Sequence, residues 1–217
     1  MDRIAVVGDV HGDVVRLRAM LRSLETFAGR IIFVGDYVGG GPDSAEVLEI
    51  LANLDERQPD RFEFLCGNHD VAFLGYIDQG AFAPFVAADG LATLASYLPL
   101  VTGDVHTALL GAVPAHHRAF LANLASCWES DACLVSHTGF DPARPLVRDV
   151  TTLASATGWP VFDAASYPRS LVVCGHYVQR HGPHDSEHLI CVDTGCGIVP
   201  NGGLSAVLLP ERRFVTI

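Results

Sequence analysis

The residues of this chain best suited to chemistry lie in five short polar motifs, each of which follows an apolar run. The motifs contain carboxylate, amide and imidazole side chains, which are ligands for divalent metal ions. Two metal ions held side by side can hydrolyse a phosphate ester. The motifs are Gly8-Asp9-Val10-His11-Gly12, Gly35-Asp36, Gly67-Asn68-His69-Asp70, Ser136-His137 and Gly175-His176.

The first metal ion would be bound by Asp9, His11 and Asp36. Asp9 and His11 alternate along an extended loop, so both side chains can point at one ion. The glycines beside them allow the backbone to approach closely. Asp36 ends the next apolar run, and its carboxylate has two oxygens, so it can bridge to a second ion.

The second metal ion would share Asp36 and bind one amide and two imidazoles. Asn68 offers a neutral amide oxygen, and His137 and His176 offer ring nitrogens. This mixed set suits manganese, iron or zinc better than calcium or magnesium. We therefore expect two divalent metal ions as cofactors, with manganese as the first choice and iron or zinc as alternatives.

The periodicity of apolar residues indicates which elements position these side chains. A helix capped by Asp13 would place Leu17, Leu21 and Leu24 on one face, and a second helix would begin at 42–44. Alternation of strands and helices predicts a βαβ core, in which ligands gather beyond the carboxyl ends of the strands. We expect strands at 3–7, 30–34, 61–66, 131–136, 170–174, 188–192, 204–209 and 212–217, the last two joined as a hairpin.

Two segments depart from this alternation. Residues 71–130 are rich in alanine and leucine and are interrupted by prolines, which predicts short helices forming an insertion or a flank. Residues 140–167 are rich in loop-forming residues. At 217 residues the chain is long enough for a substantial core, and we expect a single domain over 1–217.

Composition restricts the class of protein and its partners. Hydrophobic residues make up 49% and charged residues 18%, which predicts a compact globular protein. A formal net charge of -11 argues against binding to a nucleic-acid backbone. The apolar runs are too short to span a bilayer and no secretion signal is evident, so we expect a cytoplasmic protein that does not bind membranes. The oligomeric state is left open.

The six cysteines form no Cys-x-x-Cys pair. Free thiols in a reducing compartment are the favoured interpretation, with a disulfide between Cys191 and Cys196 as the alternative.

Together the five motifs resemble the signature of the calcineurin-like metallophosphoesterases. Segments 35–44, 190–196 and 202–206 are similar to the phosphoprotein phosphatase branch, in which bacterial serine/threonine phosphatases and symmetrical diadenosine tetraphosphate hydrolases are found. The resemblance covers nearly the whole chain except 71–130 and 140–167. It implies a four-layer αββα sandwich with a small helical insertion and with the dimetal site at the edge of the sandwich.

The resemblance also implies roles for the residues. A hydroxide between the two metal ions would attack phosphorus, and His69 matches the general acid that protonates the leaving oxygen. The implied activity is that of a phosphomonoesterase resembling serine/threonine phosphatases, acting on a phosphorylated substrate of unknown identity. A phosphodiesterase, a dinucleoside polyphosphate hydrolase and a non-catalytic binding module are the alternatives, although the module is disfavoured because all six ligand positions and His69 are present.

The chain departs from the family at the residues that would bind phosphate. Gly39 and Gly40 stand where relatives have an aspartate that orients the catalytic histidine and an arginine that clamps the phosphoryl group. Cys66 replaces a second arginine, and Asp70 replaces a glutamate. The glycines would leave room for a larger or diesterified substrate. Candidates for a replacement clamp, each more simply read as a surface residue, are Arg144, Arg148 and Arg180.

Three other features have rival interpretations. Asp193-Thr194-Gly195 resembles the active-site triplet of aspartic proteases, but that mechanism needs a second copy, so Asp193 more simply supports the metal site. A cluster of histidines at 181–188 is read as a solvated loop. The adjacent pair His116 and His117 gives no reason to prefer a functional role.

Overall fold

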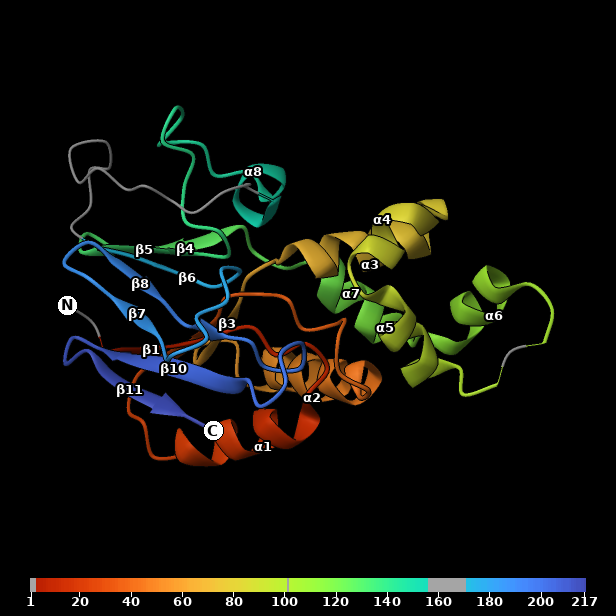
Figure 1. Cartoon of the computed structure of the whole chain (residues 1–217), viewed down its shortest axis with the longest axis horizontal. Coiled ribbons are helices and arrows are strands. Elements are labelled where there is room, and N and C mark those ends of the chain that lie inside the picture. Colours follow the sequence, from red (N-terminus) through yellow and green to blue (C-terminus); the bar gives the residue numbers. More distant parts are fainter. Residues whose placement is uncertain (1–2, 101, 156–170) are drawn as a thin grey trace.

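Two β-sheets pack face to face at the centre of the molecule, and helices cover their outer faces (Figure 1). The computed structural model describes residues 3–100, 102–155 and 171–217. Apolar side chains fill the space between the sheets, among them Val6 and Val34 from one sheet and Val135 and Val173 from the other. This arrangement confirms the predicted four-layer αββα sandwich.

The first sheet has the strand order β11-β10-β1-β2-β3, and the short β9 pairs with β10. β1, β2 and β3 are parallel and are connected by α1 and α2, as the βαβ pattern predicts. β10 and β11 are antiparallel and form the predicted hairpin. The bounds are β1 Ile4–Val7, α1 Val14–Ser23, β2 Arg30–Phe33, α2 Ser44–Arg57, β3 Phe62–Phe64, β9 Asp193–Thr194, β10 Gly203–Leu209 and β11 Arg213–Thr216.

Both helices of the first sheet begin and pack as their sequences indicate. The side chain of Asp13 caps α1 by accepting a hydrogen bond from the backbone N–H of Arg16 at 2.9 Å. Leu17 from α1 and Leu48 and Leu51 from α2 are fully buried against the outer face of the sheet. Burial of each such side chain contributes about 1.5–3 kcal/mol.

The second sheet has the strand order β4-β5-β6-β8-β7, in which β5, β6 and β8 are parallel and the two edge strands are antiparallel. The segment 71–130, expected to form short helices, also contains the strand β4, which pairs with β5. The three residues of β4 are too few to show the alternation of apolar and polar residues that predicts a strand. The two-residue strands β7 and β9 escape prediction for the same reason. The bounds are β4 Cys127–Glu129, β5 Cys133–Ser136, β6 Leu171–Cys174, β7 His184–Asp185 and β8 Leu189–Cys191.

Helices α3 to α7 form a flank beside the first sheet (Figure 1). Phe73, Phe85 and Phe120 from this flank join the same apolar core as α1 and α2, and Tyr76 stacks on Phe85 with ring centroids 4.5 Å apart. The single-domain organisation stays a prediction. The bounds are α3 Asn68–Gln79, α4 Phe82–Ala87, α5 Gly90–Tyr97, α6 Val105–Ala112 and α7 Ala115–Ala122.

A further helix, α8 (Val150–Ser155), lies in the segment 140–167, which was expected to be rich in loops. Residues 156–167 of this segment lie outside the described residues, as does residue 170 of the strand predicted at 170–174. All six cysteines are free, so Cys191 and Cys196 form no disulfide. Among the described helices, none has the length and apolar character that a membrane span requires.

The buried carboxylate of Asp70 joins the loops that follow β2 and β3. It accepts hydrogen bonds from the backbone N–H groups of Asp36, Tyr37 and Gly67 at 2.8, 3.0 and 3.0 Å, and Asp70 is 1% exposed. Polar groups buried in this way are costly when they lose their partner. Asp70 is therefore a structural residue that fixes two loops relative to each other.

We predict that Asp70→Ala lowers the free energy of unfolding by about 3 kcal/mol or more, because three buried N–H groups lose their acceptor. Urea denaturation measures this change. Asp78→Ala on the same helix is the matched control, since Asp78 forms an exposed ion pair with Arg118 and such pairs contribute about 1 kcal/mol at most. Equal losses in the two variants would contradict the assigned role.

Candidate dimetal site

Both sheets contribute loops to one cluster of polar side chains. Asp9 follows β1, Asp36 follows β2, and Asn68 is the first residue of α3, directly after β3. His137 follows β5 and His176 follows β6 in the second sheet. The parallel strands of each sheet end at the same edge, and the structure thereby brings together all six residues that the sequence predicts as metal ligands.

Three of these residues have an unusual backbone conformation. His11, Asp36 and His176 have φ angles of 44°, 53° and 63°, in the left-handed region that residues other than glycine rarely adopt. Each such residue costs about 1–3 kcal/mol and persists only where its surroundings enforce it. The carbonyl of Asp36 accepts hydrogen bonds from Val10 and His11 N–H groups at 3.1 and 2.9 Å, which holds two of these loops together.

One group of ligand atoms consists of Asn68, His137 and His176. The Nδ1 atom of His176 lies 2.9 Å from the Asn68 Oδ1 atom and 3.2 Å from the Nε2 atom of His137, which is itself 3.1 Å from Asn68 Oδ1. Ligands of one tetrahedral metal ion with bonds of about 2.0–2.2 Å lie about 3.3 Å apart. These atoms are already at nearly that spacing.

A second group consists of Asp9 and His11. The Nε2 atom of His11 lies 3.9 Å from Asp9 Oδ2. The other ring nitrogen, Nδ1, lies 3.3 Å from the Val38 carbonyl, and Nδ1 of His137 lies 3.1 Å from the Val34 carbonyl. A backbone carbonyl that accepts the Nδ1 proton leaves the Nε2 lone pair available, as is usual for histidines that bind metals.

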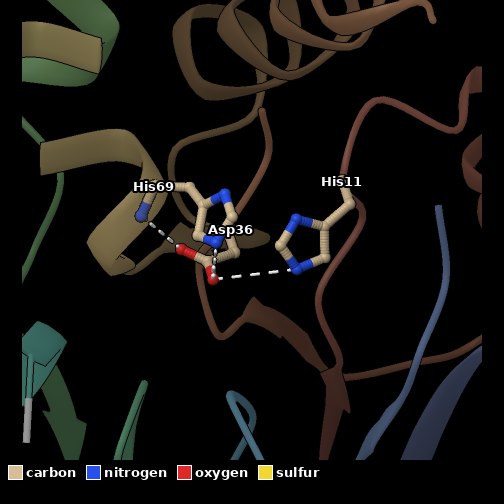
Figure 2. A group of neighbouring side chains, drawn as sticks. All are labelled: His11, Asp36 and His69. Atoms are coloured by element: carbon tan, nitrogen blue, oxygen red, sulfur yellow. Dashed lines mark hydrogen bonds and ion pairs between the residues drawn. The ribbon is translucent and has the colours of Figure 1, made fainter. Parts of the chain in front are cut away.

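One oxygen of Asp36 faces both groups. Its Oδ2 atom lies 3.7 Å from His11 Nε2 and 3.9 Å from Nε2 of His69 (Figure 2). The same atom is 3.3 Å from His137 Nε2. The second oxygen, Oδ1, accepts a hydrogen bond from the backbone N–H of His69 at 2.9 Å. The Oδ2 atom of Asp36 thus lies between the two ligand groups.

The charges of the cluster also fit divalent cations. Asp9, Asp36 and Asp193 are each at most 2% exposed, and within the described part of the chain no arginine forms an ion pair with any of them. Burial raises the pKa of Asp9 well above its ordinary value, and the neighbouring charges of Asp193 and Asp36 raise it further. Bound cations would supply the missing positive charge.

Two of the three ligand histidines, His11 and His176, have lowered pKa values, which favours the neutral imidazole that a metal ion binds. Burial lowers the pKa of His11 to about 4 and that of His176 to about 4. Burial would raise the pKa of Asp36, but the imidazoles of His137 and His69 outweigh it and hold that pKa below its ordinary value. Burial would lower the pKa of His137, but the charge of Asp36 outweighs it and raises that pKa. A metal ion bound here would replace the proton of His137, because metal ligands have to be deprotonated.

His69 lies at the rim of this cluster, in the first turn of α3. Its ring meets that of His11 edge to face, with centroids 4.6 Å apart (Figure 2). The Nδ1 atom of His69 is buried without a hydrogen-bond partner. Gly39 stands where the resemblance places an orienting aspartate, and among the described residues no other acceptor reaches this nitrogen.

The expectation that the glycines leave room for a larger substrate is wrong at Gly39 and Gly40. Any Cβ atom at Gly39 would meet the His69 ring and the Ala88 carbonyl, and one at Gly40 would meet Ile198 and Gly197. The φ angles of 85° and 69° also disfavour a side chain. The loop is filled by its neighbours, so an aspartate or arginine does not fit there.

The helical flank takes part in this filling, which the sequence does not indicate. The turn between α4 and α5 places the Ala88 carbonyl beside Gly39, and the hydroxyl of Thr93 on α5 accepts a hydrogen bond from the Gly39 N–H at 2.9 Å. Thr93 is fully buried. A single threonine in an alanine-rich helix gives no signal of such a role in the sequence.

The candidate clamp residues are paired elsewhere or exposed. Arg144 forms an ion pair with Asp141 at 2.9 Å, and Arg148 with Glu129 at 2.8 Å. Arg180 is exposed. These observations support the reading of all three as surface residues.

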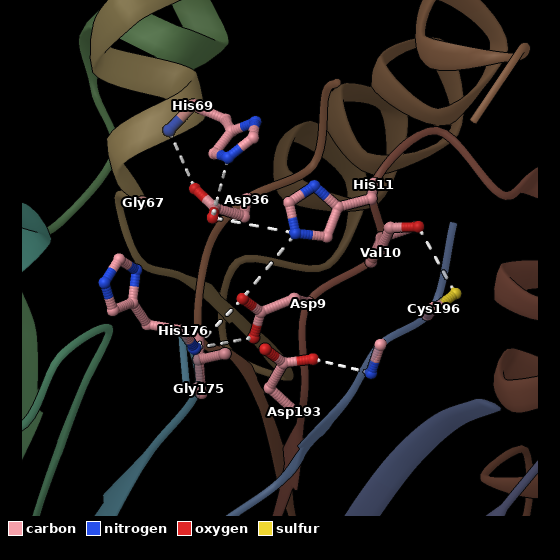
Figure 3. A network of polar contacts seen from close by, with 12 residues as sticks. Asp9, Val10, His11, Asp36, Gly67, His69, Gly175, His176, Asp193 and Cys196 are labelled. Carbon is pink, nitrogen blue, oxygen red and sulfur yellow. Dashed lines mark hydrogen bonds and ion pairs between the residues drawn. The ribbon is translucent and has the colours of Figure 1, made fainter. Parts of the chain in front are cut away.

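Asp193 lies beside Asp9 at the inner end of the site (Figure 3). Its Oδ1 atom accepts a hydrogen bond from the Gly195 N–H at 2.8 Å, while Oδ2 is buried without a partner in the described part of the chain. Burial raises the pKa of Asp193 to about 6. Because Asp193 lies next to the ligand cluster, we interpret it as a residue that assists this cluster and not as the carboxylate of an aspartic protease.

The sequence and the fold place the chain in a known family. The calcineurin-like phosphoesterase model matches residues 2–180, so the chain belongs to the calcineurin-like phosphoesterases and is a phosphoesterase. It is 25% identical to an asymmetrical bis(5'-nucleosyl)-tetraphosphatase, PrpE, of Halalkalibacterium halodurans, over 98% of this chain and 92% of the relative.

Two further similarities lie in the same superfamily. A symmetrical bis(5'-nucleosyl)-tetraphosphatase of Proteus mirabilis is 26% identical over 75% of this chain and 56% of the relative. The crystal structure of a cold-active protein-tyrosine phosphatase of a psychrophilic Shewanella species superposes with a TM-score of 0.69 at 18% identity, over all of this chain and 80% of that one. The latter likeness concerns the fold alone.

We predict that Gly175→Ala weakens the binding of manganese, because the new Cβ atom would collide with the carboxylate of Asp9. Overpacking of this kind costs about 1–3 kcal/mol, which the chain would relieve by moving Asp9. Manganese titration measures the effect. Gly111→Ala is the control, since no atom lies within 4 Å of its Cβ position, and unchanged affinity in both variants would refute the prediction.

Proposed function

We propose that the chain is a dimetal-dependent phosphomonoesterase, in which Asp9, His11 and Asp36 bind one ion and Asp36, Asn68, His137 and His176 bind the other. The observation that carries the proposal is the single Asp36 oxygen that faces both ligand groups. Divalent ions bound there supply the activated water and neutralise charge on the phosphoryl oxygens.

The residues of the chain account for the remaining steps. His69 protonates the leaving oxygen, and the hydrogen bond from its backbone to Asp36 holds its ring next to the ligand cluster. Asn68 lies beside His69 in the first turn of α3, and the N-terminus of that helix favours a bound anion. Asp70 positions the whole segment through its backbone hydrogen bonds.

Manganese is the metal we propose, because the donor set combines carboxylates, an amide and imidazoles. We also propose a cytoplasmic location, which six free cysteines support.

A second candidate is a dinucleoside polyphosphate hydrolase. The similarity to the tetraphosphatase of Halalkalibacterium halodurans extends over almost the full length of both chains. The filled Gly39 and Gly40 positions leave no arginine to clamp a terminal phosphate there, which weakens the case for a monoester. A diadenosine tetraphosphate substrate shares the same reaction at phosphorus and needs the same ligands.

We predict that Asp36→Ala and His176→Ala abolish metal-dependent hydrolysis with loss of bound metal. His69→Asn keeps the metal but lowers turnover by roughly 100- to 10,000-fold, the usual contribution of a general acid. Metal content by mass spectrometry and initial rates separate these outcomes. His181→Ala is the control, because His181 is exposed; full activity in His69→Asn would remove His69 from the mechanism.

A panel of substrates separates the two candidate functions. With manganese, the proposed phosphomonoesterase hydrolyses p-nitrophenyl phosphate and a phosphopeptide more efficiently than bis-p-nitrophenyl phosphate or diadenosine tetraphosphate, as measured by kcat/KM. Chelator abolishes each activity. A preference for diadenosine tetraphosphate would favour the second candidate, and activity that survives chelation would refute both.

A further inference from the structure

A second cluster of possible metal ligands lies away from the dimetal site, between α2 and α7. His116 and His117, adjacent in the first turn of α7, both reach the carboxylate of Glu49 on α2. The Nε2 atoms of His116 and His117 lie 2.8 and 3.0 Å from the same oxygen, Glu49 Oε2. Neighbouring residues of a helix do not normally share a face, so their convergence on one atom is specific.

The three donor atoms have the composition and spacing of a metal site. All lie within 4.8 Å of one another. Two imidazoles and one carboxylate are a set that binds Zn²⁺ with a fourth position open to water. Separations of 2.8 and 3.0 Å have to widen only slightly to reach the roughly 3.3 Å between ligands of a tetrahedral zinc ion.

Groups outside this set hold two of the three donors in place. The Tyr97 hydroxyl lies 2.7 Å from the Nδ1 atom of His117, and the Asn53 side-chain amide donates to Glu49 Oε1 at 2.7 Å. When Nε2 of His117 binds a metal, its proton moves to Nδ1, where the Tyr97 oxygen can accept it. Outer partners of this kind fix the tautomer and the orientation of ligands.

Burial and charge also suit a cation. His117 is 2% exposed, whereas the side chains of His116 and Glu49 are about half exposed, so an ion can enter from solvent. The carboxylate of Glu49 supplies the negative charge of the set. Asp55 and Glu56 line the same groove and offset the positive end of the α7 dipole.

We propose that Glu49, His116 and His117 form a zinc site separate from the dimetal centre, which links α2 of the sandwich to α7 of the helical flank. The hydrogen bonds between the imidazoles and Glu49 hold the three donors together in the absence of the ion. Binding replaces these two hydrogen bonds with three coordination bonds and leaves one coordination position open to water.

Zinc binding to the Asp36→Ala/His176→Ala variant tests the proposal, because that background removes the dimetal site. Equilibrium dialysis with Zn²⁺ alone is expected to give one bound equivalent. His116→Gln should weaken that binding by roughly 100-fold, and Tyr97→Phe by roughly 10-fold, because Tyr97 only orients His117. His181→Gln, on an exposed histidine outside the cluster, should leave the affinity unchanged.

The wild-type protein provides a second measurement that does not depend on the folding of that background. Saturation with Zn²⁺ is expected to give three equivalents for wild type and two for His116→Gln, an exposed substitution outside the core. Replacement by Co²⁺ should add a visible absorption band that His116→Gln removes. Equal zinc content in wild type and His116→Gln would overturn the proposal, as would a loss of zinc in His181→Gln equal to that in His116→Gln. The cluster would then be only a set of hydrogen bonds between two helices.

Discussion

The site depends on the position of one carboxylate, that of Asp36. Its backbone N–H is held by Asp70, its carbonyl binds the loop that carries His11, and its Oδ1 atom accepts from the first turn of α3. These contacts orient the carboxylate so that Oδ2 lies between the two ligand groups. The loops that follow β1, β2 and β3 are thereby held together by hydrogen bonds to Asp36.

Much of this arrangement was predictable because it follows from strand direction. The apolar runs before Gly8, Gly35 and Gly67 are recognisable as buried strands, and parallel strands deliver their following loops to one edge. The same reasoning places His137 and His176 after β5 and β6 of the second sheet. The ligand types then indicate metal binding, since carboxylates and imidazoles are common ligands of divalent metal ions.

Other parts of the site rest on contacts that leave no pattern in the sequence. The space beside Gly39 is filled by the His69 ring and by the Ala88 carbonyl from the helical flank, and backbone atoms have no sequence signature. Thr93 and Asp70 act through hydrogen bonds to backbone N–H groups far along the chain. The pair His116 and His117 acquires a partner only because α2 and α7 pack side by side.

The left-handed backbone at His11, Asp36 and His176 has a consequence for how the enzyme handles its metals. Because the strain is stored when the chain folds, the ligand loops need little rearrangement on binding an ion. The ligand loops are thus prearranged by the packing of the sandwich. Such a centre spends little binding free energy on ordering its own loops, which leaves more of it for holding the ions.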